Sequence, residues 1–352
     1  MPRATITQVA ALAGVSIASA SRALNGQIAS AETVEKVRRA AAELGYVADA
    51  AARSLKLGRT QQLAYAVADI GNPVYVEMMS AVERVVAASG YRLVISSTGT
   101  ASSTLDVVRD LGRGYVDGMI LSPLRVTPEL LDALTDVPVP VVVLGSVPGG
   151  SALDTVQADS HTGMSLVVDH LVEEGRQTLV FINGPVDTTP GRLRLQGFED
   201  AVRAHPGIRS RTVTAGDFTI ASGYRAARDV LDDARTPRPD AIVAANDLIG
   251  IGVMHAADDL GWTVPYDLAI TGMDNTELAQ VARLGLTSID LGAEERGRVA
   301  ADLLLARIAD PHRAAHTVTV APSLVVRGSS LNGAAALDGA ASLRAVEEKD
   351  AG

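Results

Sequence analysis

"TQVAALAGVSIASASRALNG", residues 7–26, contains two short alanine-rich segments joined at a glycine. Apolar side chains recur at helical spacing over residues 6–13, and Thr5 can cap the first turn of that helix. Gly14 is typical of a helix end, and Ser16 can cap a second helix. Two helices joined by a tight turn at glycine predict a helix-turn-helix, although an ordinary helical hairpin has the same spacing.

A third amphipathic segment follows over residues 30–44, with Ser30 as its cap. Its apolar side chains are expected to complete a three-helix core: Val34, Val37, Ala41 and Leu44. The side chains of the second helix that face away from this core are short, or basic: Ile17, Ala18, Ser21 and Arg22. A helix with short outward side chains can enter the major groove of DNA, and an arginine at its end can bind guanine or phosphate.

The first 60 residues differ in charge from the rest of the chain. They hold eight basic and four acidic residues, a net charge of +4, whereas the whole chain carries −10 and the remainder therefore −14. Charge close to the phosphates sets affinity for nucleic acid, and charge beyond a Debye length of roughly 8–10 Å is screened. An acidic total is therefore compatible with a DNA-binding head.

The segments "TITQVAALAGVSIASASRALNG" (5–26) and "VEKVRRAAAELGY" (34–46) resemble the head of the LacI/GalR family of bacterial transcription regulators. The resemblance implies that Ile17, Ala18 and Arg22 contact base edges. It also implies that three polar residues lie near the DNA backbone: Ser16, Ser21 and Asn25. Together with Thr5, these six residues form the predicted DNA-binding set of the head.

Residues 49–57 can form two turns of helix after the head. Isolated helices shorter than ~12–15 residues are marginal in water, so we expect this one to form only against DNA and a partner copy. The resemblance implies that the hinge helix enters the minor groove, where Leu55 wedges between base pairs and Ala52 permits close approach of the paired helix. The alternative to this wedge is that Leu55 is a linker residue that packs on the body. Family members commonly have Pro-Asn before this helix, whereas Ala48-Asp49 places a carboxylate near the phosphates.

Beyond the hinge, short apolar runs alternate with amphipathic helices. Seven runs, from "LAYAVAD" at 63–69 to "DLAITGMD" at 267–274, are expected to be strands buried on both faces. The alternation predicts an α/β body of two doubly wound parallel-sheet subdomains. The domain boundaries that we predict are a helix-turn-helix head at 1–47, a hinge and linker at 48–60, a body at 61–331 and a disordered tail at 332–352. Within the body, the first subdomain is expected over about 61–158 and 288–313, and the second over about 159–287 and 314–331.

Polar side chains follow the predicted strands, and in such folds ligands bind beyond the carboxyl ends of strands. These strand-end residues are Asp69, Asn72, Ser97, Ser122, Asn246, Asp247, Asp274 and Asn275, with Arg192 and Arg194 before a helix. The motifs "DIGNP", "DHLVEEG", "RLRLQGF", "AAND" and "ITGMDN" resemble the same family's effector domain, whose fold is periplasmic-binding-protein-like. The predicted effector-binding set is Asp69, Asn72, Ser122, Arg194, Phe218, Asn246 and Asp274.

The resemblance implies that Arg194, Asn246 and Asp274 bind sugar hydroxyls and that Phe218 packs on a sugar face. Carboxylates and guanidinium forks bind adjacent hydroxyls in pairs, and an aromatic ring suits the C–H face of a sugar. Each of these residues also has a structural alternative. Arg194 could form a structural ion pair and Phe218 could be a core residue, and Asp247 and Asn275 could be helix caps or turn residues.

Other functional classes find little support in the sequence. The chain has no cysteine, which excludes disulfides, thiolate nucleophiles and cysteine-ligated metals. No G-x-S-x-G, Walker-type loop or G-x-G-x-x-G occurs. His312 and His316 are four residues apart, but they follow Pro311 in a predicted loop, and no other histidine spacing suggests a metal site. We therefore expect no enzyme activity, no cofactor and no metal. No secretion signal and no apolar stretch of ~18 residues is present, so we expect a cytoplasmic protein with no membrane partner.

These features predict a sequence-specific repressor of transcription, controlled by a small sugar or related metabolite bound between two subdomains. One head makes too few base contacts for useful specificity, so a homodimer on a pseudo-palindromic double-stranded operator is expected. A solute-binding protein without regulatory DNA binding is the alternative. The effector's identity, its action as inducer or corepressor, and the choice between dimer and tetramer are left open by the sequence.

Overall fold

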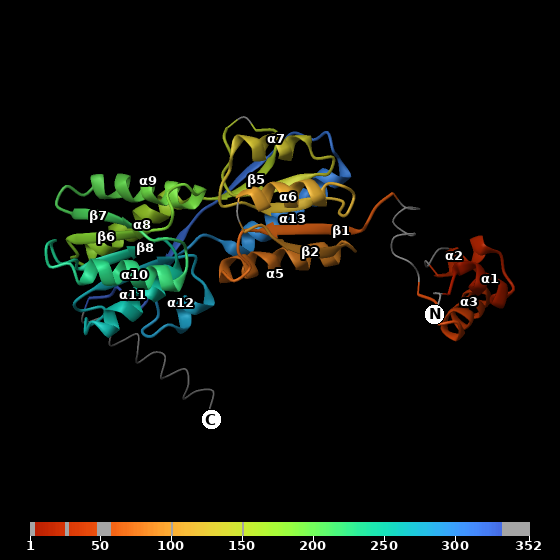
Figure 1. The fold of residues 1–352 in the computed structure, drawn as a ribbon, viewed down its shortest axis with the longest axis horizontal. Coiled ribbons are helices and arrows are strands. Elements are labelled where there is room, and N and C mark those ends of the chain that lie inside the picture. Colours follow the sequence, from red (N-terminus) through yellow and green to blue (C-terminus); the bar gives the residue numbers. More distant parts are fainter. Residues whose placement is uncertain (1–3, 25–27, 48–57, 100, 150, 333–352) are drawn as a thin grey trace, which may run out of the picture. The chain divides into compact units, whose positions relative to one another are not determined.

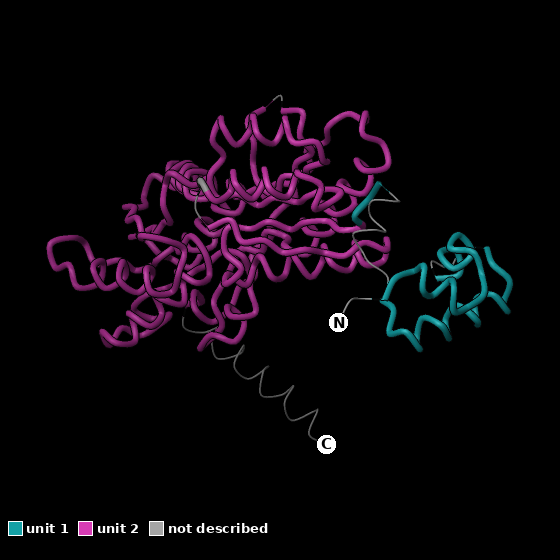
Figure 2. Tube along the Cα trace, turned by 45° about the vertical axis from the view of Figure 1, so that its right-hand side comes forward, with its two compact units in different colours: residues 1–60 teal, residues 61–352 magenta. Residues whose placement is uncertain are grey.

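The computed structural model describes residues 4–24, 28–47, 58–99, 101–149 and 151–332. The chain divides into two compact units, residues 1–60 and residues 61–352 (Figure 2). The predicted hinge helix at 49–57 lies outside the described residues, and so does the predicted tail apart from Asn332. Among the helices that are described, none combines the length and apolar character needed to cross a bilayer.

The first unit is a helix-turn-helix built from α1 (Ile6–Ala13), α2 (Ile17–Leu24) and α3 (Ala31–Glu43) (Figure 1). Thr5 caps α1, because its hydroxyl accepts from the Gln8 backbone N–H while the Gln8 side chain accepts from the Thr5 N–H at 2.8 Å. Gly14 ends α1 with a φ of 67°, and the Ser16 hydroxyl accepts from the Ser19 N–H at 3.1 Å. The predicted helix-turn-helix is confirmed.

Small side chains fill the core of this unit. The buried residues are Val9, Ala10, Ala20, Ala23, Val37, Ala40 and Ala41. Leu44, expected in this core, is 36% exposed because it follows the last turn of α3 as its C-cap. Val34 packs against the core only partly. With alanine at most contact positions, the three helices can approach closely and leave the outward face of α2 free.

The second unit contains two six-stranded sheets. The first sheet has the order β11-β5-β4-β3-β1-β2 and is parallel throughout. Its strands are β1 (Gln62–Val67), β2 (Arg92–Ser97), β3 (Met119–Ser122), β4 (Val141–Leu144), β5 (Asp154–Ala158) and β11 (Thr317–Val320). Figure 1 shows α5 (Pro73–Ala88) and α13 (Ala293–Ala309) on one face, and α6 (Ala101–Leu111) and α7 (Pro128–Asp136) on the other.

The second sheet has the order β12-β10-β9-β8-β6-β7, with only β12 antiparallel. Its strands are β6 (Thr178–Asn183), β7 (Arg209–Thr214), β8 (Ala241–Ala244), β9 (Ala269–Met273), β10 (Thr287–Asp290) and β12 (Ser323–Val325). The helices α8 (Ser160–Glu173) and α9 (Thr189–Arg203) cover one face, and α10 (Ile220–Leu231) and α11 (Asp247–Asp259) the other (Figure 1). A short α12 (Glu277–Val281) follows β9. The predicted pair of doubly wound sheets is confirmed.

The chain passes between the two sheets after β5, after β10 and after β11. The predicted boundaries place most of the strand at 287–290 in the first subdomain, and the strands within 314–331 in the second. These placements are wrong for β10 and β11: β10 pairs with β9 and β12 in the second sheet, whereas β11 pairs with β5 in the first. The boundaries expected near 288 and 314 therefore shift to about 291 and 321. An apolar run identifies a strand, but the neighbour it pairs with depends on long-range packing.

One predicted strand is less buried than expected. The run at 91–97 was expected to be buried on both faces, yet β2 alternates between exposed and half-buried residues. It lies at the end of its sheet and lacks a neighbour on one side. Edge strand β7 alternates in the same way, and its polar sequence gave no apolar run to detect. The other six predicted strands are almost wholly buried.

Candidate DNA-binding face and effector site

The outward side of α2 carries the predicted base-contacting residues. Ile17, Ala18 and Arg22 are exposed, while Ala20 and Ala23 on the opposite side are buried. The only hydrogen bond described for the Arg22 guanidinium is a long one, 3.4 Å, to the Ser19 hydroxyl. The face therefore offers an apolar side chain at its start and an accessible cation in its last turn, the arrangement that a recognition helix needs.

The remaining predicted DNA-binding residues are placed less uniformly. Thr5 and Ser16 are exposed at the helix starts that they cap, and Ser21 is half-buried. Asn25, Ala52 and Leu55 lie outside the described residues. The DNA contacts of all these residues stay predictions.

In the body, a cavity of about 350 Å³ lies where the carboxyl ends of strands from both sheets meet. All seven predicted effector residues line it: Asp69, Asn72, Ser122, Arg194, Phe218, Asn246 and Asp274. The volume is at the lower end of the ~300–1,000 Å³ typical of small-molecule sites. Ser97, Arg192, Asp247 and Asn275, the other strand-end residues named from the sequence, do not line it.

Arg194 and Asp274 form a buried ion pair in the wall of the cavity. The Arg194 Nη2 lies 3.3 Å from the Asp274 Oδ1, and Nη1 donates to the Ala245 carbonyl at 2.6 Å. The Arg194 Nε is buried without a hydrogen-bond partner among the described residues. Burial raises the pKa of Asp274, an effect that nearby Arg194 and Arg296 oppose. A buried donor left unpaired is costly, so this guanidinium is suited to donate to a polar ligand.

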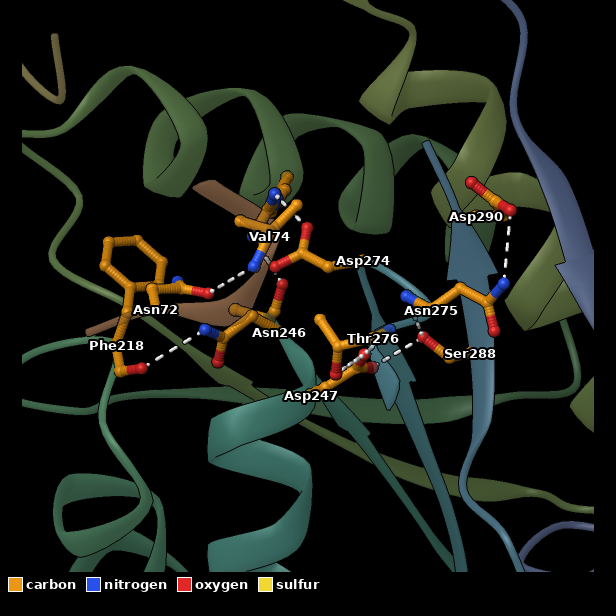
Figure 3. A network of polar contacts seen from close by, with 12 residues as sticks. Asn72, Val74, Phe218, Asn246, Asp247, Asp274, Asn275, Thr276, Ser288 and Asp290 are labelled. Atoms are coloured by element: carbon orange, nitrogen blue, oxygen red, sulfur yellow. Dashed lines mark hydrogen bonds and ion pairs between the residues drawn. The ribbon is translucent and has the colours of Figure 1, made fainter. Parts of the chain in front are cut away.

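The turn that carries Asp274 has an unfavourable backbone. Asp274 has a φ of 110° and Asn275 a φ of 50°, values that favour glycine. Polar contacts hold the turn in place (Figure 3): the Asn275 N–H donates to the Ser288 hydroxyl at 3.0 Å, and its amide donates to Asp290 at 3.1 Å. Strain held by surrounding contacts is a feature of ligand sites, and here it fixes the direction of the Asp274 carboxylate.

Asp247 does not line the cavity, but its carboxylate holds the same turn in place. Its carboxylate accepts from the Thr276 N–H at 2.7 Å, from the Thr276 hydroxyl at 2.9 Å and from the Ser288 hydroxyl at 2.5 Å (Figure 3). Burial, together with the charge of Asp274, raises the pKa of Asp247 to about 7. Its alternative interpretation as a turn residue, rather than a ligand contact, agrees with these contacts.

Asp247→Asn is expected to change how stability depends on pH. The folded pKa of about 7 lies above the unfolded value of about 3.9, so between these values only the folded chain keeps the proton. The free energy of unfolding of the wild type therefore falls by on the order of a few kcal/mol as pH rises from 4 to 8. The variant lacks this slope, which urea unfolding at pH 5 and pH 8 measures. Asp258→Asn is the control, because Asp258 lies on the same helix as Asp247 but is exposed and paired with Arg283. Equal slopes for wild type and Asp247→Asn would contradict the expectation.

Two asparagines at the cavity also start helices. Asn72 caps α5 by accepting from the Val74 N–H at 3.2 Å, and Asn246 caps α11 by accepting from the Ile249 N–H at 2.9 Å. Asn246 additionally donates to the carbonyl of Phe218 at 3.1 Å (Figure 3). The Phe218 ring lies against Gly184, where a β-carbon would come within 2.2 Å of the ring. The two caps therefore fix the amide groups of Asn72 and Asn246 at the cavity, and the close contact with Gly184 fixes the Phe218 ring there.

Several cavity residues were not predicted from the sequence. Among them are Tyr75 on α5, Arg125, Asp217 and Arg296 on α13. Arg296 could have been found, because it lies three residues after Ala293 and four before Ala300, on the buried side of α13. A charge on the apolar side of a helix is a sign of a site. Within the described part of the chain, no group of three or more acids and histidines could hold a metal ion.

Comparison with known proteins agrees with this architecture. The model of bacterial regulatory proteins of the lacI family matches residues 5–49, and the periplasmic binding protein-like domain matches residues 168–330. The ribose operon repressor of Escherichia coli K12 is 34% identical over 93% of this chain and 100% of its own. The HTH-type transcriptional repressor PurR of Pectobacterium atrosepticum is 33% identical over 94% of this chain and 98% of its own.

Two solved structures are similar over nearly the whole chain. A lac repressor dimer bound to operator and the anti-inducer ONPF has a TM-score of 0.84 at 25% identity, covering 94% of this chain and 100% of that one. A complex of the transcriptional regulator CelR with cellobiose has a TM-score of 0.70 at 32% identity, covering 93% and 100%.

A helix-turn-helix head joined to a periplasmic-binding-protein-like body with a cavity at its strand ends defines a DNA-binding transcriptional regulator. The chain belongs to the lacI family of bacterial regulatory proteins.

Proposed function

We propose that this regulator is a homodimeric repressor that binds a pseudo-palindromic operator and changes its affinity when a small sugar or related metabolite occupies the cavity. The observation that carries the proposal is a buried arginine–aspartate pair, open to a small cavity, in the same chain as a helix-turn-helix head.

The chemistry of the cavity supports a polyhydroxylated effector. Arg194 offers a buried unpaired N–H, Asp274 offers acceptor oxygens, and two amide side chains lie near them. Such groups bind adjacent hydroxyls in pairs, and Phe218 offers an apolar edge. One relative is a ribose operon repressor, and another regulator was solved with cellobiose, so a sugar is the first candidate. The alternative function, a solute-binding protein without regulatory DNA binding, is disfavoured by the helix-turn-helix head and by the repressor relatives.

Coupling between the two sites requires that the effector favour one arrangement of the body. Because the cavity is lined by both sheets, a ligand that contacts both can shift their relative position. Residues 48–60 would transmit that shift to the head, with Ala52 and Leu55 in the minor groove. The coupling is reciprocal, so operator DNA should change effector affinity by the same factor. A regulator of this kind works beside the chromosome, in the cytoplasm, and needs neither enzyme activity nor a metal or other cofactor.

Selection of DNA fragments by the purified full chain tests the proposal. We expect one pseudo-palindromic sequence to be enriched and to bind on the order of 10³-fold or more tightly than a scrambled fragment. Repeating the titration with ribose, cellobiose and other sugars should then change the affinity for at least one of them. The absence of any preference over scrambled DNA, with each sugar present and absent, would refute the proposal.

A further inference from the structure

The charged residues that line the cavity are Asp69, Arg125, Arg194, Asp217, Asp274 and Arg296. Arg125 is held by Asp187 through two hydrogen bonds, of 2.8 and 3.2 Å. Arg194 pairs with Asp274. Arg296 differs from both arginines because it belongs to no ion pair among the described residues. Its Nε, like that of Arg194, is buried without a hydrogen-bond partner.

The fold holds Arg296 at the cavity. It lies on the buried side of α13, whose backbone packs so closely on α5 that a β-carbon at Gly297 would come within 2.4 Å of the Met78 carbonyl. This close approach places Arg296 beside Tyr75 and within electrostatic range of Asp274 and Arg194. The position of the guanidinium is thus set by helix packing rather than by a partner of its own.

Two carboxylates lie in electrostatic range of Arg296, but neither forms an ion pair or hydrogen bond with it among the described residues. Asp274 is already paired with Arg194, and Glu77 is exposed. Burial lowers the pKa of Arg296, which means that its charge is partly desolvated. A partly desolvated guanidinium is stabilised by a carboxylate or phosphate, whose oxygens match its planar fork. No protein group described in the structure fulfils that role.

We propose that the effector carries an anionic group, a carboxylate or a phosphate monoester, which Arg296 binds while Arg194, Asn246 and Asp274 bind its hydroxyls. The inference rests on the proposed function of the cavity and specifies its ligand class: a sugar acid or a sugar phosphate in place of a neutral sugar. The volume of about 350 Å³ favours a ligand of monosaccharide size.

Calorimetric titration of the full chain tests this assignment with matched sugars: D-glucose, D-gluconate and D-glucose 6-phosphate, and D-ribose with D-ribose 5-phosphate. We expect at least one charged compound to bind about ten- to a hundredfold more tightly than its neutral counterpart, the value of one charge-assisted hydrogen bond. Arg296→Met should lose that preference. Arg298→Met, which removes an exposed arginine from the same helix, should keep it. The gluconate and phosphate arms distinguish the two anionic groups.

Inorganic phosphate provides a probe that does not depend on the choice of sugar. It should raise the melting temperature of the wild type and of Arg298→Met, but not that of Arg296→Met. Without ligand, Arg296→Met should melt no lower than the wild type, because it removes an unpaired buried charge. A lower melting temperature of the ligand-free variant would indicate a structural role and overturn the proposal.

Two further outcomes would overturn the proposal that the effector carries an anionic group. One is a neutral sugar that binds as tightly as its charged counterparts, which would leave the regulator's proposed function intact. The other is the absence of stabilisation by every charged sugar and by phosphate. Failure of the proposed function itself is seen separately, as the absence of any DNA preference with each sugar present and absent, so the two failures are distinguishable.

Discussion

Arg22→Ala is expected to lower operator affinity by roughly 30-fold to 10⁴-fold while leaving effector binding unchanged. Arg22 is exposed in the last turn of α2 and has only a 3.4 Å hydrogen bond to Ser19. A bidentate contact from arginine to a base is worth about 1–3 kcal/mol of discrimination, and a dimer on two half-sites loses it twice. Fluorescence anisotropy with the selected operator and a scrambled fragment measures the loss.

Arg39→Ala is the matched control for this substitution. It also removes one exposed arginine from the head, but Arg39 lies on α3, where Glu35 is 3.5 Å away. A loss of charge alone should weaken binding to both fragments alike and reduce its salt dependence. If Arg22→Ala weakens both fragments to the same extent as Arg39→Ala does, then Arg22 contacts only phosphates and the predicted base contact is wrong.

Local rules sufficed to predict the head. Thr5, Gly14, Ser16 and Ser30 act within three or four residues of themselves, and each starts or ends the helix expected of it. Leu44 shows where such rules fail, since its position fits the helical periodicity of α3 although, as the C-cap, it lies outside the core. The buried parallel strands were equally predictable, because a strand covered on both faces is a continuous apolar run.

Pairing partners and isolated charges were not predictable in this way. The neighbours of β10 and β11 depend on which sheet has an open edge, and neither strand's own residues record it. The strand-end rule located five cavity residues, because the carboxyl ends of parallel strands meet at one edge of a sheet, whereas Arg194 and Phe218 were named from the family resemblance. It could not locate Arg296, which comes from a helix, or Tyr75, which enters from α5. Strand ends mark the site, and helices supply its further chemistry.

Arg194→Met is expected to abolish effector binding and to destabilise the body without affecting the DNA-binding face. The substitution leaves Asp274, 5% exposed, without its ion-pair partner. Breaking a buried pair by removing one member costs about 3–5 kcal/mol, although proton uptake by Asp274 can reduce this. Binding of the best sugar should fall by about a hundredfold or more, because a guanidinium that lines the cavity is lost.

The pH dependence of this destabilisation identifies its cause. Burial already raises the pKa of Asp274, and removal of Arg194, which opposes that effect, raises it further. The folded variant therefore keeps a proton that the unfolded chain releases near pH 4, so its penalty is small below that pH and grows as pH rises through the folded pKa. Urea unfolding should show a larger deficit at pH 8 than at pH 5.

Arg194→Met combined with Asp274→Asn should recover most of the deficit at pH 8, since no unpaired charge is left in the wall of the cavity. A deficit equal at both pH values, and unchanged in the double variant, would mean that Arg194 stabilises the body by packing and its hydrogen bond to Ala245 rather than by its charge.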